Sequence, residues 1–430
     1  MVTSFSRLYK MALAYATPGC TASGVTLTGN AELAGAIVNA LDWMVANVYK
    51  TSGASYGNWF DWEVQGAQYF VDTQTLMYAR LSEDQLITYA AAIDNYGPNS
   101  ANMADYFFWG ALTGANTTSV ALVTAVDGIL VKDGAKIAQI NAPNGVPKVF
   151  PKVTDGDGFY ADGSYIFHGN IPYNGHYGMV MLEGVTTLTS LLDGSTWTIY
   201  DASTFPNVYD WITDGFMPFF YHGALMDCVR GRSVGTSGET GPSVGSELLG
   251  YFQKVAGFVT TPGSKASAFT AFAASPHPAT GQYHFPNMDR VVAHRPNFSL
   301  ALSMSSTRVA NYEDLFGDAN IHGYFQGDGM TYLYVGSSDT QFVNGYWPSV
   351  DYYHLTGTTT EQGTVSTPSV TDQHFVGGAS VRNSNGVSAY GVAAFALHPV
   401  LETGTSTLQG KKSYFMLENE VICLGAGITA

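Results

Sequence analysis

The sequence is poor in cysteine and has no long apolar run. Only three cysteines, Cys20, Cys228 and Cys423, occur among its 430 residues, so a disulfide framework is excluded and at most one pair can form. No stretch of about twenty apolar residues is present, so we expect no membrane-spanning helix. The first residues lack a charged segment followed by an apolar one, and we expect no signal peptide within this numbering.

Charged residues are scarce, and basic residues most of all. They make up 12% of the chain, with 18 Lys and Arg against 34 Asp and Glu, for a net charge of −16. This excludes a nucleic-acid partner, because phosphate binding needs a basic face. It also disfavours a polyanionic ligand, so any anion site would depend on a few well-placed Arg and amide groups.

Several enzyme signatures are missing as well. The chain has no Gly-rich phosphate loop ending in Lys-Ser/Thr, no His-Glu-x-x-His and no Gly-x-Ser-x-Gly. Its histidines are not spaced as a zinc-binding set, so we expect neither a catalytic metal nor a cofactor.

The residues that are present describe a globular protein, since 46% are apolar and 13% aromatic. With so little charge, the surface must depend on uncharged polar residues, as is common in extracellular proteins. A glycosylation sequon at Asn297 is consistent with a secretory route. We therefore expect a secreted monomer whose signal peptide was removed before this numbering begins.

Two periodicities divide the chain. In the first half, apolar residues recur at helical spacing, and Ser82 with Gln85 forms a capping box before one such run. After about residue 260, apolar and polar residues alternate as in half-buried strands. We predict helices over residues 33–48, 86–93, 120–130 and 179–192, and strands over residues 298–304, 387–397 and 413–424. An α domain, residues 1–260, thus precedes a β domain, residues 261–430, which we expect to be incomplete at its C-terminal end.

The first of four segments that could carry chemistry is Gly-Asn-Trp-Phe-Asp-Trp-Glu, residues 57–63. Trp59, Phe60 and Trp62 offer flat faces of the kind that stack on sugar rings. Asn58 and two acidic residues lie between them and favour a solvated site. The alternative is that these rings belong to a helix core.

The second segment, residues 112–119, carries Asn116, whose amide could donate hydrogen bonds to a carboxylate. Asn116 also begins an Asn-Thr-Thr sequon, so a glycosylated surface residue is the alternative.

The third and fourth segments carry acid–base and cationic groups. Residues 157–178 place His168, Tyr173 and Tyr177 in a Gly-rich loop before a helix. A phenol is a poor base unless nearby positive charge lowers its pKa, whereas imidazole titrates near neutrality. Arg230 and Arg232 follow in residues 227–238, and Arg can stabilise a phenolate or bind a carboxylate. The alternatives are a structural loop and a surface ion pair.

Together these segments resemble polysaccharide lyase family 8, which contains hyaluronate, chondroitin AC, xanthan and some mannuronan lyases. NWFDWE is similar to the family's NWWDWE, LTGAN to the segment with the catalytic Asn, and RGRS to the active-site Arg segment. DGFYADGSYIFH followed by YNGHYG resembles the catalytic loop, with His168 and Tyr177 nine residues apart. In the β half, MDRVVAHRPNFSLALSMSS, GYFQGDGMTYLY, YWPSVDYYHLTGTTT and KKSYFMLENEVICLGAGI are also similar to family signatures.

The resemblance implies an incomplete α/α toroid of paired helices followed by a large antiparallel β-sandwich. It implies β-elimination of a uronic-acid polymer: Asn116 neutralises the uronate carboxylate, Tyr177 takes H5 and returns a proton to O4, and His168 assists. Arg232 would lower the tyrosine pKa, with Arg230 behind it. The implied substrate-binding residues are Asn58, Trp59, Phe60, Trp62, Tyr173, Arg230, Glu313 and Asp318.

The sequence also departs from the family pattern. Thr236 stands four residues beyond Arg232, where related lyases carry a further Arg. FGDAN replaces the family's NGEN, so Asp318 is expected to replace its Glu, ahead of Glu313. WEVQGA replaces a segment beginning WEIG, which leaves the edge of the aromatic segment in doubt.

Other functions stay open. The expected substrate is an unsulfated polyuronate, with mannuronan and hyaluronan or chondroitin ahead of xanthan. One alternative is a catalytically silent carbohydrate-binding protein. Another is a glycoside hydrolase on a similar toroid, which would need a carboxylate pair drawn from Asp61, Asp157 and Asp162.

Overall fold

The computed structural model describes residues 1–97, 112–201, 203–258, 265–314, 317, 319–336, 341–343, 345–363, 367–382, 388–401 and 404–430. The chain divides into two compact units. The first comprises Met1–Phe150 and Glu183–Asp201, and the second comprises Pro151–Leu182 and Ala202–Ala430. All three cysteines are unpaired. None of the described helices combines the length and apolar content that crossing a membrane requires.

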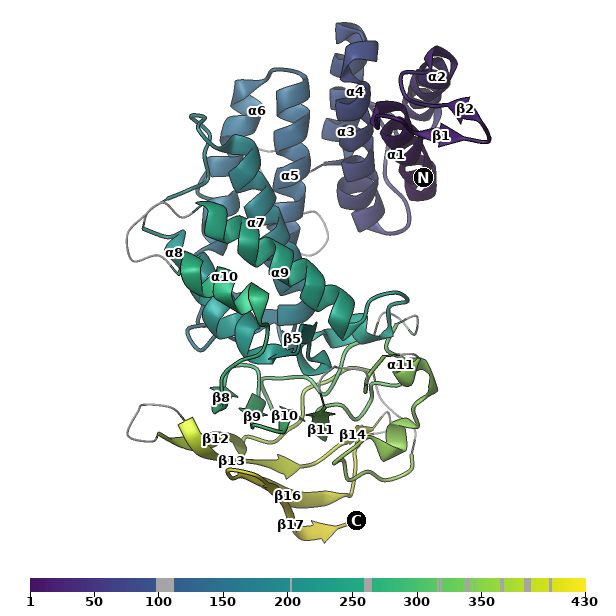
Figure 1. Cartoon of the computed structure of the whole chain (residues 1–430). Helices are drawn as coiled ribbons and strands as arrows, with labels where there is room; N and C mark the ends of the chain where they lie inside the picture. Colours follow the sequence, from purple (N-terminus) through teal and green to yellow (C-terminus); the bar gives the residue numbers. More distant parts are fainter. Residues whose placement is uncertain are drawn as a thin grey trace. The chain divides into compact units, whose positions relative to one another are not determined.

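The first unit is built from helices (Figure 1). They are α1 (Val2–Ala16), α2 (Ala31–Asn47), α3 (Gly66–Met77), α4 (Glu83–Tyr96), α5 (Gly114–Leu130), α6 (Gly134–Ala138) and most of α7 (Met179–Leu192), with a small hairpin of β1 (Thr21–Ala22) and β2 (Val25–Thr26). α1 packs against α2 and α3, and α3 packs against α5. The apolar faces of these helices enclose one core, which includes Phe5, Ile37, Leu41, Phe70 and Tyr89.

The helices predicted from apolar spacing are confirmed. Ser82 and Gln85 form the predicted capping box, with Gln85 N donating to Ser82 Oγ at 3.2 Å and Ser82 N to Gln85 Oε1 at 3.0 Å. α5 begins at Gly114, six residues before the predicted start. Its first turns hold small and polar residues, which give no apolar periodicity.

The second unit combines helices, tight hairpins and two larger sheets. Its helices are α8 (Pro206–Asp210), α9 (Gly241–Phe258), α10 (Ala266–Ala274) and α11 (Tyr346–Ser349). Its short strands are β3 (Gly158–Phe159), β4 (Tyr165–Phe167), β5 (Ile171–Pro172), β6 (Phe220–Tyr221), β7 (Ala224–Leu225), β14 (Val400–Leu401) and β15 (Gly404–Thr405).

The two larger sheets form an antiparallel sandwich. One has the order β11-β10-β9-β8, from β8 (Gly281–Phe285), β9 (Arg290–His294), β10 (Phe298–Met304) and β11 (Asp328–Val335). The other has the order β12-β13-β16-β17, from β12 (Val376–Arg382), β13 (Ser388–Leu397), β16 (Gln409–Met416) and β17 (Val421–Thr429). Leu300 and Leu302 of β10 share one core with Phe395 and Leu397 of β13. Figure 1 shows the two sheets facing each other.

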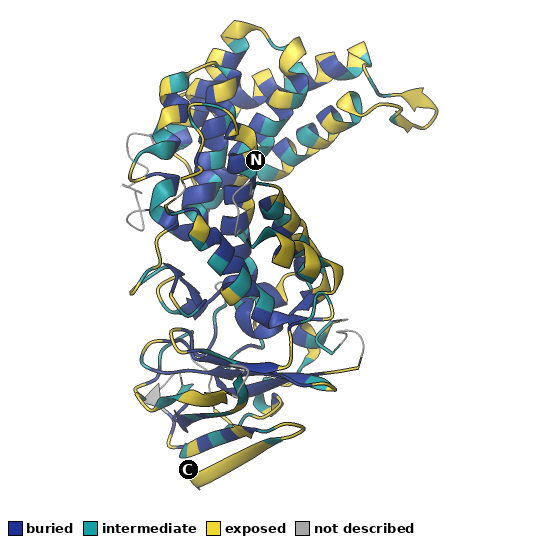
Figure 2. Ribbon diagram, turned by 60° about the vertical axis from the view of Figure 1, so that its left-hand side comes forward, coloured by how far each residue is buried: buried dark blue, intermediate teal, exposed yellow. Residues whose placement is uncertain are grey.

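The strand predicted over residues 413–424 is confirmed at both ends but is not continuous. The structure has two strands there, β16 and β17, joined by a turn in which Leu417 N donates to Glu420 O at 2.9 Å. Alternation continues on both sides of the turn, so a period of two cannot reveal where the chain reverses. Figure 2 shows β17 exposed along nearly its whole length.

The compact units do not follow the change from helices to strands. Helices continue to Ala274, beyond the predicted boundary, and the first sandwich strand begins at Gly281. Residues 151–182 nevertheless belong with the sandwich, and Ala310 N donates to Asn170 O at 3.1 Å. Asp227 N likewise donates to the hydroxyl of Tyr334 on β11 at 3.1 Å. Tertiary hydrogen bonds therefore join loops of the α half to the β half.

Candidate active site

His168 lies at the tip of a tight turn between β4 and β5. Phe167 pairs with Ile171, so only three residues reverse the chain. His168 has φ +54°, in the left-handed region that non-glycine residues rarely occupy. Gly169 N donates to Asp157 Oδ1 at 2.8 Å, which holds the turn. This constrained backbone places the His168 imidazole at the surface of the second unit, with 37% of its side chain exposed.

Tyr177 lies in a π-helical turn, Asn174–Gly178, which leads directly into α7. Single turns of this type are frequent at functional sites. The ring of Tyr177 stacks on Phe167 at 4.3 Å and meets the His168 ring edge-on, with centroids 5.0 Å apart. The nine-residue spacing seen in the sequence therefore brings an imidazole and a phenol together.

Arg232 joins this pair from a 3-10 turn, Gly231–Gly235. Its Nη2 donates to the Tyr177 hydroxyl at 2.5 Å, and its guanidinium carbon lies 5.5 Å from the centre of the same ring. Gly231 has φ +52°, and a Cβ there would lie 2.1 Å from the Tyr173 ring. Only glycine fits, so the turn that presents Arg232 depends on it.

Glu313 connects the other members of the cluster. Its Oε1 accepts from His168 Nδ1 at 2.6 Å, and its Oε2 accepts from Arg232 Nη1 at 2.9 Å and from the Tyr173 hydroxyl. The sequence ranked Glu313 below Asp318 as the replacement for the family's Glu. The structure places Glu313 in the cluster, whereas Asp318 lies outside the described residues.

The hydrogen bonds define how each group is protonated. Burial raises the pKa of Glu313, but His168, Arg232 and Tyr173 outweigh it, so the pKa lies below its usual value and the carboxylate is ionised. A carboxylate only accepts hydrogen bonds, so His168 Nδ1 is the donor in its contact with Glu313. Burial and Glu313 raise the pKa of Tyr173 well above its ordinary value, so Tyr173 stays a donor.

Tyr177 experiences opposing influences. Burial raises its pKa most, the positive charge of Arg232 lowers it, and Glu313 raises it again, leaving a pKa above the ordinary value. The sequence predicted that Arg232 would lower this pKa. Arg232 does act in that direction, but burial outweighs it in the protein without substrate.

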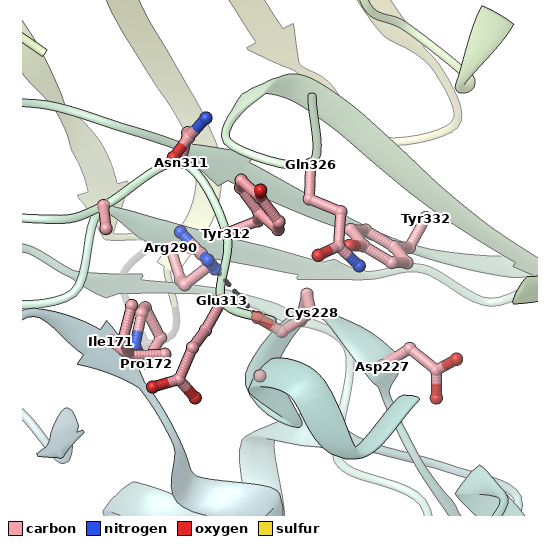
Figure 3. A pocket seen from close by; sticks show the side chains of 12 residues that line it. Ile171, Pro172, Asp227, Cys228, Arg290, Asn311, Tyr312, Glu313, Gln326 and Tyr332 are labelled. Atoms are coloured by element: carbon pink, nitrogen blue, oxygen red, sulfur yellow. Dashed lines mark hydrogen bonds between the residues drawn. The ribbon is translucent and has the colours of Figure 1, made fainter. Parts of the chain in front are cut away.

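A small cavity lies beside Glu313 (Figure 3). It has a volume of about 20 Å³ and is lined by residues including Arg290, Asn311, Gln326 and Tyr332. This is room for roughly one water molecule, not for a sugar ring. The cavity is therefore not a binding site for a sugar, and the exposed part of the cluster is the side of His168.

Arg230 is not placed as the sequence led us to expect. Its side chain is 1% exposed, and Nη1 donates to Asp227 Oδ1 at 2.7 Å. The other oxygen of Asp227 accepts from Trp347 Nε1 at 2.6 Å. Tyr173 is also fully buried. Arg230 and Tyr173 were expected to contact the substrate. Both side chains are instead buried and bonded to other groups of the protein, so their role is to hold the site in place.

Replacing Arg230 by Met is expected to destabilise the fold rather than to change substrate affinity alone. The Asp227 carboxylate would remain buried without its cation, which costs about 3–5 kcal/mol. Thermal unfolding measures this. Lys152→Met is the matched control, because the Lys152–Asp210 pair at 2.7 Å is partly exposed and is worth at most about 1 kcal/mol. Equal unfolding temperatures for the two variants would contradict the structural role of Arg230.

The remaining sequence candidates lie in the first unit. Asn116 is half-buried in the first turn of α5. Trp59 and Phe60 are half-buried and meet edge-on at 5.8 Å, and the Asn58 side chain accepts from Phe60 N at 3.1 Å. Trp62 is 2% exposed and belongs to the helical core. Its expected contact with sugar is corrected, since its ring lies against other rings and Nε1 donates to Tyr56 O at 2.7 Å.

Sequence reasoning missed two supporting groups, Asp227 and Trp347. Asp227 stands three residues before Arg230, a spacing that could have indicated an ion pair. Trp347 gives no local signal, because it comes from α11. Within the described ranges, no group of three or more His, Cys, Asp and Glu side chains is arranged to hold a metal ion.

Comparison with known proteins gives matches along nearly the whole chain. Residues 1–270 match the N-terminal alpha-helical domain of polysaccharide lyase family 8, and residues 280–430 match its super-sandwich domain. A xanthan lyase of Bacillus sp. (strain GL1) is 34% identical over 99% of the chain and 46% of that protein. A hyaluronate lyase of Thermasporomyces composti is 33% identical over 100% of the chain and 57% of that protein.

A solved structure agrees with these matches. The chondroitin AC lyase of Streptomyces coelicolor A3, in complex with chondroitin sulphate, has a TM-score of 0.85 and 30% identity, covering 100% of the chain and 62% of that protein. These matches confirm the fold class predicted from the sequence, an α/α toroid followed by an antiparallel β-sandwich. The chain spans about half the length of the curated relatives it matches.

Proposed function

The chain belongs to polysaccharide lyase family 8, and from that premise we propose that it cleaves an acidic polysaccharide by β-elimination. The observation that carries the proposal is the hydrogen bond from Arg232 Nη2 to the Tyr177 hydroxyl at 2.5 Å, beside His168 and Glu313. A guanidinium in contact with a phenol is the arrangement that stabilises a phenolate. Without such a partner a buried phenol would keep its proton, and only the phenolate can act as a base.

The proposed reaction uses Tyr177 twice. Its phenolate takes H5 of the uronate, and the electron pair of the C5–H bond enters the ring and becomes the C4–C5 double bond. The C4–O4 bond breaks, and the Tyr177 phenol returns the proton to O4 of the leaving sugar. One residue thus removes H5 and protonates O4 on the same face of the sugar ring, as a syn elimination requires. The His168 ring, held by Glu313, can accept the phenol proton before the cycle begins.

Removal of H5 also requires a neutralised uronate carboxylate, because charge develops there as the proton leaves. From the resemblance of the LTGAN segment we propose that Asn116 donates to that carboxylate. Trp59 and Phe60, both half-buried, are proposed to contact sugar rings.

We propose an unsulfated uronate polymer as the substrate. The net charge of −16 and the neutral Thr236, in place of an expected Arg, leave little basic surface for sulfate groups. The relatives are a xanthan lyase and a hyaluronate lyase, and the solved structure is a chondroitin AC lyase. Hyaluronan and unsulfated chondroitin therefore come first, and xanthan and mannuronan remain to be tested. Because such polymers do not cross membranes, we propose that the protein acts outside the cell.

The test is ultraviolet absorbance of the protein incubated with mannuronan, guluronan, hyaluronan, unsulfated and sulfated chondroitin, and xanthan. Elimination leaves a conjugated double bond in the product, whereas hydrolysis leaves none. A rise with one polymer supports the lyase and identifies its substrate. Binding without any rise would instead support the silent carbohydrate-binding alternative.

The glycoside hydrolase alternative gains no support from the second unit. Asp162 accepts backbone hydrogen bonds from Ser164 and Asn287, both at 3.0 Å, and Asp157 accepts the Gly169 amide. Both carboxylates therefore hold loops in place. New reducing ends without absorbance would still identify a hydrolase.

A further inference from the structure

A second histidine–carboxylate pair adjoins Tyr177. His176 Nδ1 lies 3.6 Å from Glu239 Oε2, and the His176 and Tyr177 ring centres are 4.8 Å apart. Nδ1 of His176 and Oε2 of Glu239 are buried and face each other. The His176 side chain as a whole remains 23% exposed. The imidazole therefore turns Nδ1 to a carboxylate while the ring stays partly accessible beside the proposed base.

Glu239 is held in place and ionised. Its backbone oxygen accepts from the buried Arg230 Nη2 at 3.0 Å. Burial raises the pKa of the Glu239 carboxyl, but its contacts with His176, Arg230 and Ser233 outweigh burial, so this pKa lies below its usual value. A fixed carboxylate that faces one ring nitrogen orients an imidazole.

The charges around Tyr177 explain why this histidine matters. Arg230 is neutralised by Asp227, and Arg232 by Glu313. With Glu239, the cluster contains three carboxylates and two guanidinium groups. These five charged groups are Asp227, Arg230, Arg232, Glu239 and Glu313. Because Asp227 and Arg230 are buried and pair with each other, the excess negative charge is that of Glu239, and it opposes a polyanion unless a cation offsets it. His168 Nδ1 is hydrogen-bonded to Glu313 Oε1 at 2.6 Å, whereas His176 Nδ1 lies 3.6 Å from Glu239 Oε2, so we take His176 as the histidine available to a ligand.

We propose that protonated His176, oriented by Glu239, binds a carboxylate of the acidic polysaccharide next to Tyr177 and makes substrate affinity depend on pH. This rests on the proposed function and adds to it a substrate-binding residue next to the proposed base. The other groups around the His176 ring are Tyr173 and Tyr177, with Arg230 behind Glu239. Because an imidazole loses its charge between about pH 5 and 8, KM is expected to rise across that range while kcat is governed by Tyr177.

The experiment measures KM and kcat from pH 5.5 to 8.5 for the whole chain and three variants. His176→Gln should raise KM about tenfold at pH 6 and flatten its pH dependence, with kcat within about twofold. His176→Arg should keep KM low and make it independent of pH. His354→Gln is the matched control, because His354 Nδ1 also contacts a carboxylate, Asp351 at 2.7 Å, but its side chain is 75% exposed at the surface. An unchanged KM profile in His176→Gln would overturn the proposal.

Equilibrium binding separates this proposal from the lyase activity. Calorimetric titration of a hyaluronan oligosaccharide into Tyr177→Phe, with and without His176→Gln, needs no cleavage. Weaker binding of the double variant at pH 6 but not at pH 8 supports the role of His176 even if no polymer is cleaved. Equal binding at both pH values would refute it even if the lyase activity is established. Thermal unfolding of each variant verifies that the fold is retained.

Discussion

Tyr177→Phe is expected to lower kcat by about a thousandfold or more while the protein stays folded. The phenylalanine ring retains the stack on Phe167 at 4.3 Å and the edge contact with His168 at 5.0 Å. Only the hydroxyl bonded to Arg232 is lost, and with it the group proposed to take H5 and to protonate O4. The rate of absorbance increase with the best polymer measures the effect.

The chain offers a matched control for this substitution. Tyr15 is half-buried and its hydroxyl accepts from Arg80 Nε at 2.7 Å, so Tyr15→Phe removes the same type of hydrogen bond from the first unit. Tyr15→Phe should leave the rate within about twofold, since ordinary surface substitutions have small effects. A near-normal rate in Tyr177→Phe would show that another group transfers the proton.

Arg232→Met is the second substitution with a large expected effect, and it should also change how the rate depends on pH. Burial and Glu313 raise the pKa of Tyr177, and Arg232 is the group that opposes them. Without Arg232 only the raising influences remain, so the phenol ionises at higher pH. Because the phenolate is the proposed base, the alkaline rise of kcat/KM should move to higher pH, and kcat at neutral pH should fall about a hundredfold or more. Rate profiles from pH 5.5 to 10 measure both changes.

Two further variants define what Arg232 contributes. Arg232→Lys keeps the charge but loses the fork that bridges Tyr177 and Glu313, so an intermediate rate and a smaller pH displacement are expected. Arg80→Met removes an exposed arginine that also donates to a tyrosine, and it should change neither quantity. A pH profile for Arg232→Met that coincides with the original would refute the assignment of Tyr177 as a phenolate base.

The local pattern of the sequence predicted much of the site because its key residues lie close together along the chain. His168 and Tyr177 lie nine residues apart on either side of β5, and Gly231 and Arg232 share one turn. Residues that lie a few positions apart stay close in space, because the short backbone between them can adopt few conformations. Their proximity can therefore be predicted from the sequence. Four helices, α2, α4, α5 and α7, and the strands β10 and β13 were predictable for the same reason, since their periods reflect which face is buried.

Other features depend on contacts between distant residues. Glu313 reaches His168 across 145 residues, and Trp347 reaches Asp227 across 120. Nothing near Glu313 in the sequence distinguishes it from Asp318, and only the folded sandwich brings it to the cluster. Composition and periodicity by themselves determined that this chain has helices followed by strands and little positive charge.

The tertiary structure alone decided which of two similar neighbours is buried. Trp62 enters the helical core while Trp59 and Phe60 stay half-exposed, and Arg230 pairs with buried Asp227 while Arg232 reaches Tyr177. A side chain's burial depends on the surfaces that pack against it, and these come from elsewhere in the chain. Residue type and local spacing therefore identified the groups that could act, and packing determined which of them face a substrate.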